Sequence, residues 1–397
     1  MAGITRRGFV RLAGAGAGLV GLAGLAGCGG SSSSPSDDSE EAVAFQDEAI
    51  RIGMAIWSST DKLGALSVDI VRQAASALGA EVIVVDTAYE ADQLVASIET
   101  FHAAGCAGVI ACNSSDAEMA QVIEACDGHG MYLAQFFRAF TQEEAPEAWQ
   151  RAVESDHFVG AVHEDEGQVA QRLMGALLAE GGPLGTGARH IGLVAWEEGD
   201  ATFAERLVGY RAMVDAWNQS HPDDQATLAD PVYAGVSAGE AARLVQQMAD
   251  ASPDLDAIVV AGGGGDVLEG VMGQLGRMGV QGQVSVVATD FVDETDDLLE
   301  SGALLAAAGG QFADPLFAFL MAWQACQGKR EVATDSFGPV LQVPMAYVTS
   351  AEDYQEFERT HLDQAFFSDD DIKAMANLGD GDLAVKAASW WDDPTLA

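Results

Sequence analysis

The segment I-R-I-G-M-A-I-W at residues 50–57 decides the fold, together with the stretch that ends in L-G-A-E-V-I-V-V-D at 78–86. Both apolar runs are short enough for buried strands, and residues 64–78 between them have the apolar spacing of an amphipathic helix that ends at Gly79. Strand, helix and strand in this order predict a βαβ unit with parallel strands. The next predicted elements are helices at 91–104 and 116–127 and strands at 107–111 and 131–136.

A second series of the same kind follows a segment at 141–156 that has no regular pattern. Its predicted strands are 190–195, near 232, 256–261 and 284–289, and its predicted helices are 166–178, 204–218, 238–249 and 266–279. Two successive series predict an α/β fold with two Rossmann-like lobes, each built on a parallel sheet. In open sheets of this kind, ligands bind beyond the carboxyl ends of the strands.

The N-terminal segment has the pattern of an export signal. Arg6 and Arg7 precede a short apolar run, as in signals of the twin-arginine route, which carries folded proteins. The run ends in L-A-G-C at 25–28, a lipobox in which Cys28 would become the acylated N-terminus. It is too short and too rich in glycine for a membrane-spanning helix. We expect residues 1–27 to be removed as a lipoprotein signal and residues 28–47 to form a flexible tether.

Acidic residues outnumber basic residues by 61 to 19, which gives a formal net charge of −42. A surface this negative excludes nucleic acid and anionic lipid headgroups as partners. Because the acidic residues are spread along the chain, the charge indicates solubility in a salty or crowded medium more than a cationic ligand. The even number of cysteines at 106, 112, 126 and 326 permits disulfides outside the cytoplasm, but their apolar surroundings favour buried thiols.

No motif indicates an enzyme, a metal or a cofactor. H-E-D-E at 163–166 lacks the second histidine of a zinc protease, and we interpret it as an acidic helix start. The four glycines at 262–265 have neither dinucleotide-binding spacing nor the Lys-Ser/Thr of a phosphate-binding loop, so a mobile or space-making loop is favoured. We find no nucleophile elbow for Ser-His-Asp catalysis.

The order of these segments resembles the type I periplasmic binding proteins, in the ribose- and galactose-binding group. I-R-I-G-M-A-I-W-S-S-T-D at 50–61 resembles the family's opening strand and loop. Four later segments match in order: Q-L-V-A-S-I-E-T-F-H-A-A-G-C-A-G-V-I-A-C-N-S-S-D-A at 93–117, D-L-D-A-I-V-V-A-G-G-G-G-D at 254–266, V-V-A-T-D-F at 286–291 and G-G-Q-F at 309–312. The resemblance covers residues 48–350.

This resemblance implies two lobes joined by a three-strand hinge that closes on a ligand. It places the first lobe at 48–138 and 312–340 and the second at 140–311 and 341–350. Residues 351–397 remain as a C-terminal extension. Within it, S-D-D-D at 368–371 has the pattern of a helix N-cap followed by acids in the first turn.

Aromatic and polar side chains at predicted strand ends are the candidate ligand-binding residues, because a sugar-like ligand presents apolar ring faces and a rim of hydroxyls. Trp57, Phe137 and Trp196 end or follow predicted strands. By resemblance, Arg138 and Asp290 would supply polar contacts from one lobe each. The candidate set is Trp57, Asp61, Asn113, Phe137, Arg138, Trp196, Arg206, Asp290 and Gln311.

Three positions depart from the family pattern. Phe137 stands where the family has an acid, Ala204 where it has an arginine, with Arg206 nearby, and the glycines at 262–265 where it has an asparagine. These are customary partners of sugar hydroxyls. The departures therefore favour a ligand that is more apolar than a hexose or ribose bound in the usual manner.

We expect a monomeric solute-binding lipoprotein that captures a small sugar-like ligand by hinge closure and delivers it to the permease of an ABC importer. Its lipid anchor would hold it at the extracytoplasmic face of the cell membrane. The alternative is a ligand sensor that presents its closed form to a membrane signalling receptor. The two functions share all the features above.

Overall fold

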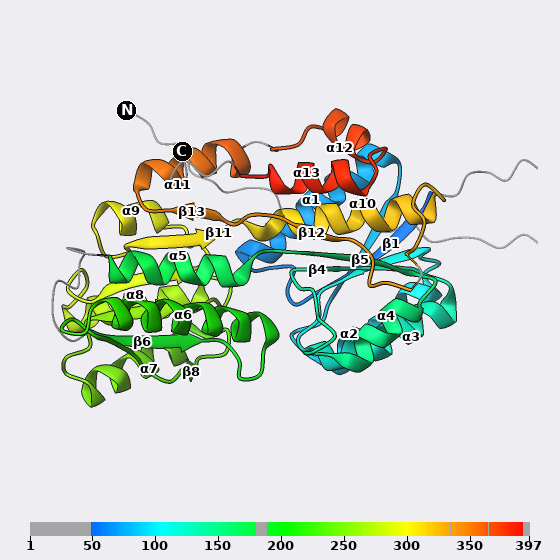
Figure 1. Cartoon of the computed structure of the whole chain (residues 1–397). Coiled ribbons are helices and arrows are strands. Elements are labelled where there is room, and N and C mark those ends of the chain that lie inside the picture. The colour runs from blue at the N-terminus through cyan, green and yellow to red at the C-terminus, as the bar shows by residue number, and fades with distance from the viewer. Residues whose placement is uncertain (1–48, 180–188, 334, 364, 392–397) are drawn as a thin grey trace, which may run out of the picture. The chain divides into compact units, whose positions relative to one another are not determined.

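The computed structural model describes residues 49–179, 189–333, 335–363 and 365–391. The expected export signal and tether, with Arg6, Arg7 and Cys28, lie outside the described residues. The chain from Glu48 onward forms one compact unit that contains two α/β lobes (Figure 1). In the described ranges, no helix combines the length and the apolar character needed to cross a membrane.

The strands are β1 (Arg51–Ile56), β2 (Glu81–Asp86), β3 (Gly108–Ala111), β4 (Tyr132–Phe136), β5 (Phe158–His163), β6 (Arg189–Ala195), β7 (Ala226–Leu228), β8 (Val232–Tyr233), β9 (Ala257–Val260), β10 (Ser285–Thr289), β11 (Ala306–Gly309), β12 (Val340–Gln342) and β13 (Ala346–Val348). The helices are α1 (Lys62–Leu78), α2 (Ala91–Ala103), α3 (Met119–His129), α4 (Pro146–Glu154), α5 (Glu166–Leu178), α6 (Ala201–Ser220), α7 (Ala238–Ala251), α8 (Asp266–Met278), α9 (Thr295–Glu300), α10 (Asp314–Cys326), α11 (Ala351–Phe357), α12 (Asp369–Met375) and α13 (Asp380–Ala388). The short helical turns are η1 (Asp116–Glu118), η2 (Gln311–Ala313) and η3 (Glu358–Leu362).

Each lobe is built on one sheet. The first sheet has the strand order β12-β5-β4-β3-β1-β2, and all its pairs are parallel. The second has the order β13-β11-β10-β9-β6-β7, with β8 beside β6, and is parallel except where β13 runs antiparallel to β11. Every residue of β3 and β9 is buried, as expected for parallel strands covered on both faces. The predicted fold of two parallel-sheet α/β lobes is confirmed.

The chain crosses between the two sheets three times. It leaves the first sheet after β5, returns after β11, and crosses again between β12 and β13. The hinge of three crossing segments is therefore present. The first crossing carries Glu164 and the second carries Gln311, so hinge residues lie next to the strand ends where ligands bind.

The first sheet extends further along the chain than the sequence analysis places it. Residues 146–154 form α4 rather than an irregular segment, and β5 after it pairs with β4. The residues of α4 are segregated between an apolar and a polar face, but its apolar content is low and α4 buries only Ala148 and Ala152, so the sequence analysis does not assign it as a helix. β12 also pairs with β5, so residues 341 and 342 belong to the first sheet and not to the second lobe.

The helices that shape the site have clear local causes. Asp61 caps α1 by accepting a bond from the backbone nitrogen of Gly64 at 2.7 Å, and Gly79 ends this helix with a φ of +66°. In α10, every residue from Asp314 to Ala325 is buried, because the helix packs between α1 and strands β3, β4 and β5. A helix that is apolar on all sides belongs in such an interior position.

The C-terminal extension packs on both lobes. α11 lies against α9 and β13 of the second lobe, while α12 lies against α1 and α13 against β12 of the first lobe (Figure 1). Ser368 and Asp371 form a reciprocal capping box at the start of α12, so the helix N-cap predicted there is confirmed.

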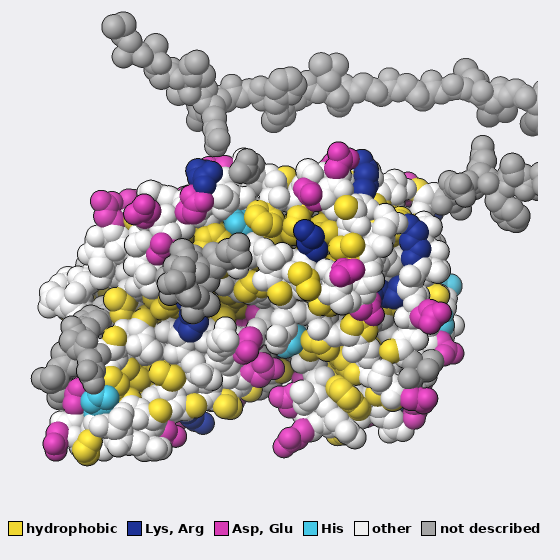
Figure 2. Space-filling model, turned by 45° about the horizontal axis from the view of Figure 1, so that its top comes forward, with side chains coloured by type: hydrophobic (Ala, Val, Ile, Leu, Met, Phe, Trp, Pro, Cys, Tyr) yellow, Lys and Arg dark blue, Asp and Glu magenta, His cyan; other side chains and the backbone are white. Residues whose placement is uncertain are grey.

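The acidic residues are spread over the surface, as the sequence analysis expects. Acidic side chains are scattered over the face drawn in Figure 2 rather than gathered in one block.

The cysteines of the described chain are free thiols, as the sequence analysis favours. Cys106, Cys112 and Cys126 are buried, and Cys326 is partly buried. Burial raises the pKa of Cys106 to about 11, which keeps this thiol protonated and unreactive.

Candidate ligand-binding site

A cavity between the lobes lies at the carboxyl ends of their strands. Its walls come from the loops after β1, β2 and β4 in the first lobe, from those after β6, β9 and β10 in the second, and from the first two crossings. Seven of the nine candidate residues line it: Trp57, Asp61, Phe137, Trp196, Arg206, Asp290 and Gln311. Most of the candidate residues therefore lie together, as expected from the rule that ligands bind beyond the carboxyl ends of the strands, which we call the strand-end rule.

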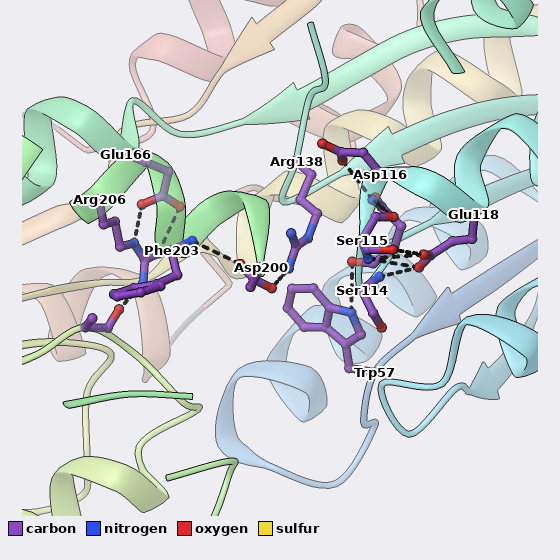
Figure 3. A network of polar contacts seen from close by, with 12 residues as sticks. Trp57, Ser114, Ser115, Asp116, Glu118, Arg138, Glu166, Asp200, Phe203 and Arg206 are labelled. Carbon is purple, nitrogen blue, oxygen red and sulfur yellow. Dashed lines mark hydrogen bonds and ion pairs between the residues drawn. The ribbon is translucent and has the colours of Figure 1, made fainter. Parts of the chain in front are cut away.

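Trp57 forms the aromatic wall of the first lobe. Its ring stacks on Tyr89 with centroids 5.2 Å apart and on Phe137 with centroids 5.8 Å apart. Its Nε1 donates to the backbone carbonyl of Asn113 at 3.1 Å (Figure 3). Because these two rings and the bond at its nitrogen hold the indole, the part of it that lines the cavity is a fixed apolar surface against which a ligand ring can pack.

Trp196 forms the corresponding wall of the second lobe. Its ring packs edge-on against Phe203 with centroids 5.8 Å apart. A Cβ at Gly262 would lie 2.9 Å from this ring, and Gly262 has a φ of +137°, so the position needs glycine. The start of the four-glycine run is thus explained by close packing against Trp196.

Arg206 lies behind Trp196 and is bound to Glu166. Its Nε and Nη2 donate to the two carboxylate oxygens at 2.5 and 2.8 Å, and its Nη1 donates to the carbonyl of Ala261 (Figure 3). Burial alone would lower the pKa of Arg206, but the ion pair with Glu166 outweighs burial and raises it. The guanidinium is therefore a permanent charge that fixes the end of β9 against α5 and α6.

Asp290 joins three parts of the site. One carboxylate oxygen accepts from the backbone nitrogens of Gly263 and Gly264 at 3.1 and 2.9 Å, and the other accepts from Nε2 of Gln311 at 3.0 Å. The end of β10, the glycine loop and the second crossing thus meet at one carboxylate. The three N–H donors hold this carboxylate in one orientation.

Three cavity residues have strained backbone conformations. Tyr89 and Phe137 each have a φ of +62°, and Asp290 has a φ of +78°. Non-glycine residues enter this left-handed region at a cost of about 1 to 3 kcal/mol and are concentrated at functional sites. The strain at these positions directs the two rings and the carboxylate toward the same cavity.

Glu164 and Asp314 form a buried carboxyl pair beside the cavity. Glu164 lies in the first crossing and Asp314 begins α10 after the second, and each is at most 1% exposed. Burial raises the pKa of both groups well above their ordinary values; repulsion by Asp314 and Glu166 adds to the effect at Glu164, and repulsion by Glu166 adds to it at Asp314. Folding therefore favours the protonated form of these two groups relative to the unfolded chain.

Arg138 and Asn113 do not line the cavity. Arg138 is buried and forms an ion pair with Asp200, the N-cap residue of α6, and its guanidinium lies 5.2 Å from the Trp57 ring. Asn113 is buried behind Trp57, where its side chain accepts from Gln135 at 2.6 Å and donates to the carbonyl of Ser115 at 2.8 Å. In this structure both residues support the aromatic wall instead of facing the cavity.

Several cavity residues escape the sequence analysis. Tyr89 follows β2, so the strand-end rule could have found it. Glu164 and Glu166 belong to the H-E-D-E motif at 163–166, where Glu166 does begin α5, but the position of this motif at a crossing is not visible from its residues. Thr202 also lines the cavity. So do Gly263 and Gly264 of the four-glycine run, which the sequence analysis interprets as a space-making loop but does not include in the candidate set.

The cavity and its mouth carry excess negative charge. Asp61, Glu166 and Asp290 line the cavity in addition to the buried Glu164. Among the described residues, Arg206 is the cation in its lining, and this cation is paired with Glu166. The mouth adds Asp266, Glu269 and Asp293, together with Lys62, whose Nζ lies 2.7 Å from Asp293. An anionic ligand would be repelled here, so the electrostatics favour a neutral or cationic one. In the described residues, no cluster of three or more His, Cys, Asp or Glu side chains is arranged to hold a metal ion.

Comparison with solved structures places the fold among binding proteins. A solute-binding protein of an ABC transporter from Agrobacterium vitis, solved with α-D-tagatopyranose, has a TM-score of 0.63 and 15% identity over 80% of this chain and 98% of that chain. A twin-arginine translocation pathway signal protein from Burkholderia phytofirmans has a TM-score of 0.67 and 16% identity over 82% of this chain and 97% of that chain. A Mycobacterium smegmatis protein in complex with β-D-fucofuranose has a TM-score of 0.65 and 15% identity over 79% of this chain and 96% of that chain.

At these identities the likeness shows the fold alone. Among curated protein sequences, none matches this chain. The family model described as periplasmic binding protein domain matches residues 52–330, which is most of the chain and spans both sheets and the first two crossings. With its two parallel-sheet lobes, three crossings and interlobe cavity, the chain belongs to the periplasmic binding protein family and has the type I fold.

Proposed function

We propose that this protein captures a small, neutral, sugar-like ligand by closure of its two lobes and delivers it to an ABC importer. The observation that carries the proposal is the interlobe cavity in which Trp57 of one lobe and Trp196 of the other accompany a polar set of Asp61, Asp290 and Gln311. Aromatic faces with a few oriented polar groups are the usual means of holding a sugar ring. The proposed role is binding, with no catalytic step.

Two further points support a sugar-like ligand. The solved structures most similar in fold include proteins bound to α-D-tagatopyranose, D-allose and β-D-fucofuranose. The excess negative charge around the cavity opposes sugar phosphates and sugar acids, whereas a neutral sugar experiences no such repulsion.

The proposal includes a location. Arg6, Arg7 and the lipobox ending at Cys28 support export by the twin-arginine route and anchoring at the extracytoplasmic face of the membrane by a lipid. A monomer on a tether of residues 28–47 could then turn to present its closed form to a permease.

A thermal-shift screen followed by calorimetry tests the function. The screen uses the neutral sugars D-galactose, D-allose, D-fucose and D-tagatose, with D-glucosamine as a cation and D-galacturonate and D-galactose 6-phosphate as anions. We expect at least one neutral sugar to stabilise the protein and the anions to have no effect. Small-angle scattering should show a smaller radius of gyration with the bound sugar than without it. Binding of an anion in preference to every neutral sugar would contradict the proposal.

A further inference from the structure

A second, smaller chamber adjoins the central cavity. The two share Leu63, Gly264, Asp290 and Gln311 as lining residues, so only these side chains and backbone atoms separate them. We call this space the side chamber. Lys62 and Gly310 lie at its edge, and its five remaining walls are Leu66, Phe291, Phe312, Phe357 and Leu362. A ligand group that passes Leu63 and Gln311 would enter it.

The side chamber is apolar. Its five remaining walls carry no polar side-chain atom, and the polar side chains at its edge are already paired. Lys62 Nζ donates to Asp293 at 2.7 Å, and Gln311 Nε2 donates to Asp290 at 3.0 Å. A second sugar ring would lose its bonds to water here without gaining equivalent ones, whereas an alkyl group would gain from leaving water.

The C-terminal extension builds part of this chamber. Phe357 ends α11 and Leu362 ends η3, and both lie beyond residues 52–330, which the family model matches. The chamber therefore depends on a segment outside the matched domain. Its presence is a property of this chain rather than of the matched domain.

The wall formed by Phe357 is fixed. Its ring lies 5.3 Å from the Phe291 ring and stacks on His361 with centroids 5.0 Å apart. A Cβ at Gly310 would lie 2.7 Å from this ring, and Gly310 has a φ of +89°, so the second crossing makes room for Phe357 by having glycine there. A preformed apolar wall needs little ordering when a ligand group reaches it.

We propose that the side chamber receives a short alkyl group of the ligand that occupies the central cavity. This inference rests on the proposed function and specifies its ligand class: a neutral sugar with a small apolar substituent, such as an alkyl glycoside. By the same measure of free space, the side chamber is about half as large as the central cavity, about 30 Å³ against about 60 Å³, so a substituent smaller than the ring in the central cavity suits it better than a second ring.

The direct test compares free sugars with their alkyl glycosides. Calorimetry on the full-length protein would use D-galactose, D-allose, D-fucose and D-tagatose and the methyl and isopropyl glycosides of each. For the sugar that binds best, each buried carbon should tighten binding about fourfold, so the isopropyl glycoside should bind at least tenfold more tightly than the free sugar. Equal or weaker binding of the glycosides, with the free sugar still bound, would overturn the side chamber and leave the sugar-binding function intact.

Substitutions of Leu362, which lines the side chamber, test the proposal by filling or enlarging that space. Leu362→Phe fills the chamber and should remove the advantage of the isopropyl glycoside while changing the affinity for free sugar less than twofold. Leu362→Ala enlarges it and should shift the preference toward a butyl glycoside. The control is Leu378→Phe, the same change at a half-buried leucine of the extension that lines neither space. If the advantage persists in Leu362→Phe, the alkyl group lies elsewhere.

Xenon probes the side chamber in the absence of any sugar, because xenon binds in apolar cavities. A saturable shift of the xenon-129 resonance in wild type and Leu378→Phe, lost in Leu362→Phe, supports the side chamber even if no sugar binds. In that case the sugar ligand is wrong and an apolar group of another ligand class is indicated. The same xenon response in all three proteins would overturn the side chamber.

Discussion

Arg138 of the first lobe and Asp200 of the second form an ion pair in which each side chain is no more than 3% exposed. Asp200 also accepts from the backbone nitrogen of Phe203 at 2.9 Å, so the same carboxylate caps α6 and holds the opposite lobe. A second, more exposed ion pair between Lys62 and Asp293 also joins the lobes. Two ion pairs therefore join the lobes in this structure.

Removing the charge of Asp200 should open the protein. Asp200→Asn keeps a good helix cap but leaves Arg138 buried and unpaired when the lobes are closed, at a cost of roughly 3 kcal/mol or more. Small-angle scattering of the ligand-free variant should give a larger radius of gyration than wild type, and its sugar affinity should fall about tenfold or more. Asp165→Asn, at the cap of α5, is the control and should change neither. An unchanged radius in Asp200→Asn would show that other contacts close the lobes.

Truncation of Trp57 should weaken binding without unfolding the protein. Burying an indole face contributes a few kcal/mol, so Trp57→Ala should reduce affinity by roughly a hundredfold, and Trp196→Ala should act in the same direction. Ligand addition should also shift or quench tryptophan fluorescence less in Trp57→Ala than in wild type. Trp149→Ala serves as the control, because Trp149 stacks on Phe337 and lines neither cavity space. Wild-type affinity in both cavity variants would mean that the site is misplaced.

Neutralising Asp290 should disturb both the ligand and the glycine loop. Asparagine tolerates the φ of +78°, but its amide group cannot accept the bonds that the carboxylate receives from Gly263, Gly264 and Gln311 together. We expect Asp290→Asn to lower affinity about tenfold, measured by calorimetry, with a small loss of stability. Asp266→Asn, at the mouth of the cavity, should have a smaller effect. Equal effects of the two changes would indicate that only the general negative charge matters.

The Glu164–Asp314 pair should make stability fall as the pH rises. Burial raises the pKa of both groups, so the folded state keeps a proton that the unfolded chain releases above its ordinary carboxyl pKa values of 4.5 and 3.8. The contribution is complete below those values and is lost as the pH rises through the raised ones, with a slope of up to about 1.4 kcal/mol per pH unit for one proton. Urea unfolding from pH 5 to 9 should show a flatter profile for Asp314→Asn than for wild type.

The control for this experiment is Asp230→Asn, whose side chain is fully exposed. Its profile should run parallel to that of the wild type. A wild-type slope retained in Asp314→Asn would show that the pair does not hold a proton in the folded state.

The membrane anchor is tested by Cys28→Ala. Because the lipid is the proposed apolar attachment, this variant should appear in the soluble fraction after a high-salt wash while retaining its thermal stability and ligand affinity. Replacement of Arg6 and Arg7 by lysine should block export by the twin-arginine route and serves as the companion experiment. Membrane retention of Cys28→Ala would contradict the lipoprotein assignment, and normal export of the lysine variant would indicate the general secretory route.

Apolar runs predict most of this fold because parallel strands are buried on both faces. The sequence analysis misses β5, in which Gly160 interrupts the apolar run. Gly160 has a φ of +121°, and a Cβ there would lie 2.2 Å from the carbonyl oxygen of Pro339. The reason for this glycine is thus a segment far away in the sequence, which no local pattern reveals.

In the candidate site too, local sequence patterns predict some residues, whereas contacts between distant segments determine others. Trp57 and Trp196 are found from their places at predicted strand ends, because this inference depends only on where each strand stops, and Asp290 is found from the family resemblance. The strand-end rule does not show that Arg138 forms an ion pair with Asp200, or that Glu164 is buried beside Asp314. Both facts arise from contacts between segments that lie apart in the sequence and meet only when the chain has crossed between the lobes.

The discontinuity of the first sheet has a consequence for synthesis. Residues 314–326 form α10, which covers strands β3, β4 and β5, and β12 completes the edge of the same sheet. A growing chain must therefore make residues 166–309 of the second lobe before the apolar face of the first sheet is covered. During that interval the unfinished lobe exposes surface that favours aggregation, and its folding waits for contacts of long sequence separation. A chain built in this way gains from completing its fold inside the cell before export, which is the order of events that the twin-arginine route provides.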